Sequence, residues 1–161
     1  MGSEAKDLIR WFKDIRLNEI DLVGGKNASL GEMQRELGAR GVRVPNGFAI
    51  TTKGYRDFVA SNGLDQVIRG YLGRLRPDDL VGLQAAGAQV RRAFLAAVLP
   101  TGLAQEIRSA YAELGGAERD RDVAVRSRAT AEDLPQASFA GQQETYLNVR
   151  GEAPLLEACK K

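Results

Sequence analysis

The sequence predicts an α+β fold with a helix-rich middle. Apolar runs of strand length occur near both ends of the 161-residue chain, and helical spacing of apolar residues covers roughly residues 64–114. Glycines and prolines separate these segments. Hydrophobic residues make up 43% of the chain, which is enough to bury a core. We therefore expect one domain or a large subdomain.

The first 40 residues predict a strand, a second apolar segment and a helix. Residues 8–12 (LIRWF) form a short apolar strand, and Leu22-Val23 is expected to end another strand that leads into Gly24-Gly25. From Asn27 the spacing becomes helical, and the glycines from Gly38 onward end this helix. Its expected apolar face carries Leu30, Met33 and Leu37.

Turn residues and a cap then predict a strand followed by a helix. Residues 42–44 form a brief extended piece, 45–47 (PNG) predict a turn, and 48–50 (FAI) predict a strand. Thr51 or Thr52 can cap the next helix, because a threonine side chain accepts a hydrogen bond from the first helical turn. The apolar residues of that helix are Tyr55, Phe58 and Val59.

The middle of the chain predicts packing helices. Pro77-Asp78-Asp79 starts the longest helix and Pro100 ends it, while Thr101 is expected to cap the next one. The longest helix has the apolar stripe Leu83, Val90, Phe94 and Ala97. The next helix has the amphipathic face Leu103, Ile107, Ala110, Tyr111 and Leu114. We interpret this block as core-packing helices with solvated Arg and Glu outside.

The last third predicts two strands joined by a functional loop. Residues 122–125 form a buried-type strand that runs into Arg126, and residues 144–149 form the second strand. The stretch between them, 129–143, is rich in small and polar residues, and a helix is expected from Ala153. A mostly irregular segment between two strands is more often a functional loop than a packing device.

Composition excludes several classes of function. Lys and Arg total 23 against 21 Asp and Glu, so the balance argues against a nucleic-acid-binding domain. The chain contains no histidine, which removes histidine triads, histidine-ligated metals and a phosphohistidine carrier. One cysteine, Cys159, cannot form an internal disulfide or a zinc site, which favours a reducing compartment such as the cytoplasm. No apolar run of signal or membrane length occurs near the N-terminus.

The segment Gly24-Gly25-Lys26-Asn27 suits a phosphate. Glycines let the backbone approach a ligand, free N–H groups at a helix N-terminus favour an anion, and Lys26 adds a point charge. It is not a Walker A loop, because GxxxxGK[ST] is absent. The alternative is an ordinary glycine turn followed by a solvent-exposed lysine.

Two further segments suit an anion. Arg126, at a strand end, can offer a bidentate fork to a phosphate; alternatively it is a surface arginine that pairs with Glu132 or Asp133. Residues 138–145 (SFAGQQET) can fold over the phosphates of a nucleotide, or they form an ordinary hairpin turn. Three such segments, two with a fixed cation, predict a phosphate ligand, with ATP as the favoured one.

The same residues carry a resemblance to a known family. VGGKNASLGEM (23–33), VPNGFAITT (44–52) and AVRSRATAEDLPQASFAGQQETYLNVRG (124–151) resemble, in order and spacing, the N-terminal ATP-binding domain of phosphoenolpyruvate synthases. The resemblance covers essentially the whole chain from about Leu8. Pyruvate phosphate dikinases and rifampicin phosphotransferases share this domain and remain the alternatives within this class. A stand-alone non-catalytic nucleotide-binding or interaction module is the alternative from a different class.

The resemblance implies an ATP-grasp-like fold of the pyruvate phosphate dikinase N-terminal type, of which residues 1–161 are an incomplete first part. It implies that Lys26 and Arg126 contact ATP phosphates as the catalytic cations. It also implies that Gly141, Thr145 and, with less weight, Gln142 line the nucleotide. Family members usually have a serine where this chain has Arg128, and we expect that side chain to point outward.

The resemblance also implies a reaction that needs more than this chain. The full enzyme converts ATP, pyruvate and water to phosphoenolpyruvate, AMP and phosphate, with Mg²⁺ and a phosphohistidine intermediate. The magnesium ligands, the carrier histidine and the barrel that binds pyruvate are expected outside residues 1–161. The chain alone is therefore expected to be inactive and to bind ATP weakly at most. The resemblance leaves room for a homo-oligomeric full-length enzyme.

Overall fold

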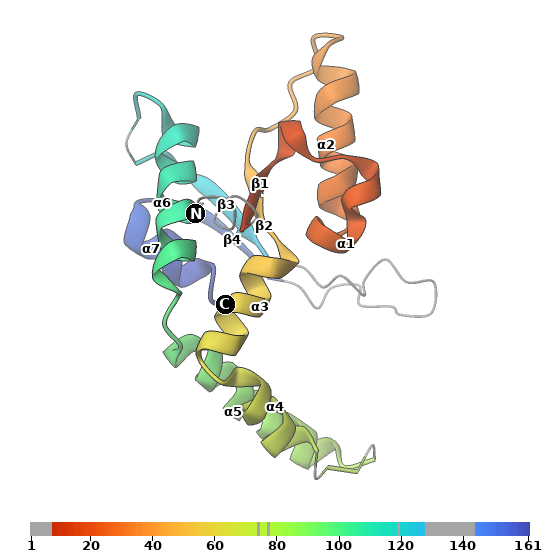
Figure 1. Ribbon diagram of the computed structural model, residues 1–161, viewed down its shortest axis with the longest axis vertical. Helices are drawn as coiled ribbons and strands as arrows, with labels where there is room; N and C mark the ends of the chain where they lie inside the picture. The colour runs from red at the N-terminus through yellow and green to blue at the C-terminus, as the bar shows by residue number, and fades with distance from the viewer. Residues whose placement is uncertain (1–7, 74, 77, 119, 128–143) are drawn as a thin grey trace, which may run out of the picture.

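The computed structural model describes residues 8–73, 75–76, 78–118, 120–127 and 144–161. Helices and small antiparallel ladders are mixed along this part of the chain, which confirms the predicted α+β class. Both ladders lie between α1 and α2 on one side and α6 and α7 on the other (Figure 1). None of the helices in the described part is both long and apolar enough to cross a membrane.

The first ladder joins the two apolar clusters of the structure. Strand β1 (Ile9–Trp11) pairs antiparallel with β2 (Phe48–Ile50), so that Ile9 lies opposite Ile50 and Trp11 opposite Phe48. These four side chains belong to the larger cluster, whereas Ala49 belongs to the smaller one. Because side chains alternate along a strand, one face of the ladder serves each cluster.

The smaller cluster packs the first helices against β2. Ile15, Val23 and Ala28 are buried there beside Ala49 of β2. They come from the segment of η2 (Phe12–Asp14), η3 (Leu17–Glu19), α1 (Ile20–Val23) and α2 (Gly25–Gly38). Arg10 of β1 adds an ion pair to η3, with 3.7 Å between its Nε and Oε1 of Glu19.

The strand end predicted at Leu22-Val23 is wrong, because these residues end the short helix α1 (Ile20–Val23). The Gly24 N–H donates to the Ile20 carbonyl at 2.7 Å. The Asn27 side chain donates from Nδ2 to the Val23 carbonyl at 2.8 Å. These bonds satisfy carbonyl groups that a helix end leaves open, so the turn is stable without a neighbouring strand.

Helix α2 lies close to the predicted range, but its packed face differs from the prediction. Met33 is 43% exposed, whereas Ala28 and Gly31 are buried. A Cβ atom at Gly31 would lie 2.7 Å from the Ile15 carbonyl oxygen and 2.8 Å from that of Phe12. Small residues therefore form the contact face, because any larger side chain would hold the helix away from η2.

Helix α3 (Thr52–Ser61) has a buried cap. Of the two predicted caps Thr51 is the one used: it is 1% exposed, and its hydroxyl oxygen accepts from the Gly54 N–H at 3.2 Å. The same hydroxyl donates to the Leu8 carbonyl at 3.2 Å, which links the helix to the start of β1. Phe58 is buried as predicted, whereas Tyr55 is exposed.

Helices α4 (Leu64–Leu72) and α5 (Leu80–Ala96) contact each other and project away from the rest of the structure (Figure 1). Asp79 caps α5 by accepting from the Gly82 N–H at 2.8 Å. The predicted stripe of α5 is buried only towards its end: Ala97 is buried and Phe94 packs on the core, but Leu83 is exposed. A projecting pair of helices has fewer neighbours at its far end.

Helix α6 (Thr101–Gly115) supplies the middle of the larger cluster. Of the predicted face, Leu103, Ile107, Ala110 and Tyr111 are buried, whereas Leu114 is half-buried. The predicted cap at Thr101 is off by one residue, since Thr101 is the first helical residue and Pro100 is the cap. The Pro100 carbonyl accepts from the Ala104 N–H at 2.9 Å, and proline lacks the N–H group that a helix start leaves unpaired.

The second ladder pairs β3 (Val123–Arg126) with β4 (Thr145–Val149), and α7 (Glu152–Ala158) follows. The register shifts between Val123 and Val125, where β4 has one extra residue. Asn148 of β4 has a positive φ of 56°, as expected at a β-bulge. The predicted buried-type strand is not fully buried: Val123 and Val125 are half-buried against the larger cluster, whereas Ala124 and Arg126 are exposed on the other face.

The hydroxyl of Tyr111 in α6 forms hydrogen bonds to the backbone on both sides of the second ladder. Its hydroxyl donates to the Arg121 carbonyl at 2.7 Å, just before β3. The same oxygen accepts from the Gly151 N–H at 2.9 Å, just after β4. Tyr111 is 2% exposed, and both hydrogen bonds are part-buried. Both strands are thereby attached to the most buried helix.

Replacing Tyr111 by Phe should lower the free energy of unfolding by about 1–3 kcal/mol, because two part-buried backbone groups lose their partner while the ring stays packed. Urea unfolding of the chain measures this. Tyr71→Phe is the matched control, since Tyr71 is exposed and should change stability by less than about 0.5 kcal/mol. Equal effects of the two variants on the free energy of unfolding would show that the two hydrogen bonds of the Tyr111 hydroxyl do not stabilise the fold.

Candidate functional site

Lys26 lies in the first turn of α2, directly after the glycine turn. Gly24 has φ 81° and ψ 153°, a region that essentially glycine alone adopts. The chain can therefore change direction between α1 and α2 within one residue. The positive end of the helix dipole lies at this end of α2, which favours an anion. The exposed Lys26 adds a positive charge there.

The turn is braced on the other side by helix α3. The hydroxyl of Thr52 donates to the Asp21 carbonyl of α1 at 3.2 Å. The second sequence motif (44–52) therefore supports the first motif (23–33). The contacts between α1 and α3 extend this support beyond a single bond.

Arg126 and Thr145 are brought together by the second ladder. They lie directly opposite each other in β3 and β4, and both are exposed. Residues opposite each other in an antiparallel pair share a face, so the guanidinium and the hydroxyl project from the same side. The Ser127 N–H donates to the Glu144 carbonyl at 3.2 Å and extends the pairing by one residue. A cation and a hydroxyl at this end can serve one anion.

Three predicted positions lie outside the described residues: Gly141, Gln142 and Arg128. The same holds for Glu132 and Asp133, the alternative partners of Arg126. Their predicted roles stay predictions.

Lys26 and Arg126 belong to elements that pack against different parts of the structure. Helix α2 packs on η2, η3 and α1, whereas β3 packs on β4 beside the larger cluster. The structure thus places both cations at exposed ends of their elements. That they meet at one triphosphate stays a prediction.

Glu144, Tyr146 and Lys161 form a separate set of contacts near the second ladder. The Tyr146 hydroxyl donates to the Glu144 carboxylate, and this hydrogen bond is the main cause that raises the pKa of Tyr146. The Nζ atom of Lys161 lies 5.2 Å from the centre of the Tyr146 ring. Glu144 is thus engaged within the protein.

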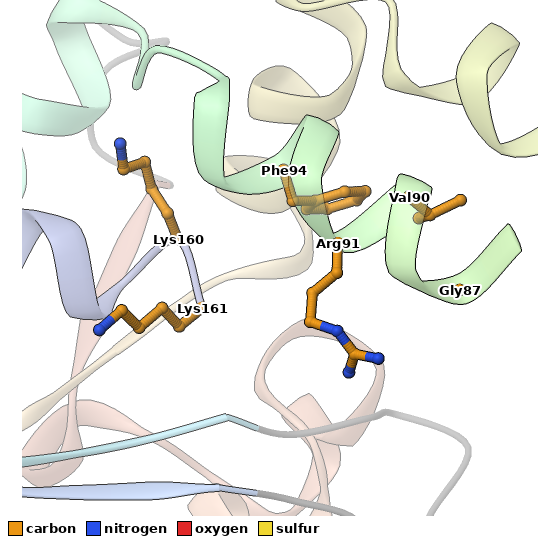
Figure 2. A pocket seen from close by; sticks show the side chains of 6 residues that line it. All are labelled: Gly87, Val90, Arg91, Phe94, Lys160 and Lys161. Carbon is orange, nitrogen blue, oxygen red and sulfur yellow. The ribbon is translucent and has the colours of Figure 1, made fainter. Parts of the chain in front are cut away.

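A hollow of about 280 Å³ lies between α5 and the last residues of the chain. It is lined by Gly87, Val90, Arg91, Phe94, Lys160 and Lys161. Figure 2 shows the amino groups of both lysines pointing away from Arg91. Lys160 donates to the Leu95 and Ala97 carbonyls and pairs with Glu157 at 2.9 Å. The cations do not converge, so this hollow is a poor phosphate site.

The described residues contain no group of three or more Asp, Glu, His or Cys side chains placed to hold a metal ion. Magnesium prefers oxygen ligands such as carboxylates. The described part of the chain therefore offers no cluster of its own for this ion.

Sequence reasoning assigned no role to the Asn27 side chain. Its bond to the Val23 carbonyl spans the glycine turn, from the residue after Lys26 to the last residue of α1. The signal that could have found it is an asparagine four residues after the end of a short apolar segment, since asparagine side chains often bond to nearby backbone groups.

Comparison with known proteins gives a consistent match. The family described as "Pyruvate phosphate dikinase, AMP/ATP-binding domain" matches residues 20–161. A phosphoenolpyruvate synthase of Neisseria meningitidis is 48% identical over 158 residues, covering 96% of this chain and 20% of the relative. The phosphoenolpyruvate synthase of Escherichia coli is 46% identical over 156 residues, covering 97% and 20%. A probable phosphoenolpyruvate synthase of Staphylothermus marinus is 44% identical over 162 residues, covering 98% and 19%. The chain thus spans about a fifth of the length of these relatives.

Replacing Gly24 by Ala should lower the free energy of unfolding by about 1–3 kcal/mol, because its backbone conformation is strained for any residue with a Cβ atom. No atom lies within 4 Å of a Cβ at this position, so the cost is conformational and not a clash. Denaturant unfolding of the chain measures it.

Gly70→Ala is the control for this substitution. Gly70 lies within α4 with equally open space around a Cβ, so alanine should stabilise the helix by about 0.5–1 kcal/mol. An unchanged stability in Gly24→Ala would contradict the assigned backbone constraint.

Proposed function

Because the chain belongs to the pyruvate phosphate dikinase AMP/ATP-binding domain family, we propose that it is the ATP-binding part of a phosphoenolpyruvate synthase (pyruvate, water dikinase). The observation that carries the proposal is the match of residues 20–161 to this family, together with relatives of that name at 44–48% identity. The full enzyme would convert ATP, pyruvate and water to phosphoenolpyruvate, AMP and phosphate. Residues 1–161 would be the incomplete first part of its ATP-grasp-like domain.

The proposed roles follow from the chemistry of each side chain. Lys26 provides a compact charge with three donors for a phosphate oxygen, and Arg126 provides a planar fork that can bind two oxygens. Thr145, opposite Arg126, adds a hydroxyl donor on the same face. Phosphoryl transfer needs mostly positioning and charge neutralisation, which two cations and backbone N–H groups supply.

The other nucleotide contacts are proposed on residues outside the described part. Gly141 would let the backbone approach the phosphates, and Gln142 would add an amide donor. Both precede Thr145 by a few residues in the sequence. The site would bind ATP as substrate and release AMP.

The remaining chemistry belongs to parts of the full-length protein outside this chain. Mg²⁺ would neutralise charge on the phosphate oxygens, and its ligands are proposed to lie there. The phosphohistidine carrier must also lie there, because this chain has no histidine. Pyruvate and phosphoenolpyruvate would bind through those parts as well. We propose a cytoplasmic, gluconeogenic enzyme that is homo-oligomeric at full length and inactive as this chain alone.

The relatives favour a synthase over the alternatives within the class. The three relatives described above are named phosphoenolpyruvate synthases, one of them as a probable one. A pyruvate phosphate dikinase would make pyrophosphate from phosphate, and a rifampicin phosphotransferase would phosphorylate the drug. Assaying the full-length protein with each acceptor separates these reactions. Absence of all three activities would support a non-catalytic module.

In the full-length enzyme, Lys26→Ala and Arg126→Ala should each lower ATP-dependent phosphorylation of the carrier histidine about 100-fold or more, because each removes a donor from the developing charge. Transfer of labelled phosphate from ATP to the protein measures this. Arg92→Ala is the control, since Arg92 is an exposed arginine of α5 and should leave the rate unchanged.

Normal phosphorylation in both the Lys26 and the Arg126 variant would remove these residues from the site. Loss in all three variants would point to a general charge effect instead of a local one.

The chain alone should bind ATP weakly at most, because it spans about a fifth of the relatives and lacks the remainder of the proposed cleft. Calorimetry with ATP and Mg²⁺ measures this affinity. A Kd in the sub-micromolar range would contradict the proposal that residues outside this chain complete the site.

A further inference from the structure

The glycine turn before Lys26 has backbone conformational freedom. This freedom must be restricted if the Lys26 side chain is to point in a fixed direction. Gly24 is buried, but it has no side chain, and a Cβ atom at this position would meet nothing within 4 Å. No side-chain contact at Gly24 therefore fixes its conformation. The surrounding hydrogen bonds must fix the turn instead.

The Asn27 side chain closes this turn from the α2 side. Its Nδ2 donates to the Val23 carbonyl at 2.8 Å in a half-buried position. Two backbone bonds complete the closure, from Gly24 N–H to the Ile20 carbonyl at 2.7 Å and from Ala28 N–H to the Gly24 carbonyl at 3.0 Å. Asn27 thus contributes the side-chain link between the end of α1 and the residue next to Lys26.

We propose that Asn27 is a positioning residue for Lys26, a role that rests on the proposed function of Lys26 as a phosphate contact. By tying α1 to the first turn of α2, Asn27 fixes the direction in which the Lys26 side chain leaves the helix. Lysine has four rotatable bonds and loses about 2 kcal/mol of rotamer freedom when it is held, so a loose turn would add to the cost of ordering it. Misplacement of a reacting or binding group by about 1 Å can cost as much as 100-fold in rate.

Alanine is the informative substitution at this position. Asn27→Ala removes the donor without adding a charge near the phosphates. Alanine is also the best helix former, so α2 keeps its intrinsic stability. Asn27→Gln retains an amide donor on a longer side chain and should restore part of the link.

Asn62→Ala is the matched control for the loss of an asparagine side-chain hydrogen bond at a helix end. The Asn62 Nδ2 donates to the Phe58 carbonyl at 2.8 Å, at the end of α3 and away from the Gly24 to Asn27 segment. It should therefore lower stability without a selective effect on ATP. The thermal midpoint Tm of every variant is measured alongside its activity, so that loss of folded protein is separated from loss of rate.

The test is a double-mutant cycle on the full-length enzyme, with kcat and KM measured against ATP. Asn27→Ala should lower kcat/KM for ATP about 10-fold, the usual size of an effect exerted through a neighbouring residue. In a Lys26→Ala background it should cause no further loss, because its target is gone. Asn27→Gln should recover part of the activity, and Asn62→Ala should keep it.

Every other result would contradict either the positioning role of Asn27 or the proposed function of Lys26. Equal losses from Asn27→Ala with and without Lys26 would overturn the proposal, since Asn27 would then act on something other than Lys26. No effect of Asn27→Ala, while Lys26→Ala is crippled, would overturn it as well and leave the proposed function intact. Full activity of Lys26→Ala itself would mean that the site assignment in the proposed function fails.

Discussion

The two faces of the β1–β2 ladder are the constraint on which the structure depends. Phe48 and Ile50 pack into the larger cluster around α6, whereas Ala49 between them packs into the smaller cluster beneath α1 and α2. A register shift of one residue would exchange these faces and expose both clusters. The ladder therefore fixes the helix that bears Lys26 against the core that supports β3 and β4.

The fold was most predictable where the sequence pattern and the packing partner agree. Helix α6 shows its buried face in the spacing of Leu103, Ile107 and Tyr111, because it packs against neighbours along its length. The packed face of helix α2 was predicted wrongly because it is formed by Ala28 and Gly31, and such small residues give no hydrophobic periodicity in the sequence. The strand end predicted at Leu22-Val23 was wrong for a related reason. A four-residue helix is too short for periodicity to distinguish it from a strand.

The site was predictable as separate pieces and not as an assembly. The phosphate-binding chemistry of Lys26 and Arg126 follows from their residue types and from the turn or strand end beside each. The pairing of Arg126 with Thr145 depends on the register of the second ladder, which a bulge at Asn148 shifts. Convergence of Lys26 and Arg126 depends on how separate elements pack, and no local pattern encodes that. The link made by Asn27 has a weak sequence signal, an asparagine four residues after a short apolar segment, because asparagine side chains often bond to nearby backbone groups.

The central claim is that two cations far apart in the sequence bind one triphosphate. A structure of the full-length protein with a non-hydrolysable ATP analogue tests it most directly. We predict the Lys26 amino group and the Arg126 guanidinium about 2.7–2.9 Å from oxygens of the same triphosphate. The claim would be contradicted by an analogue bound elsewhere, with the two side chains facing separate regions of solvent.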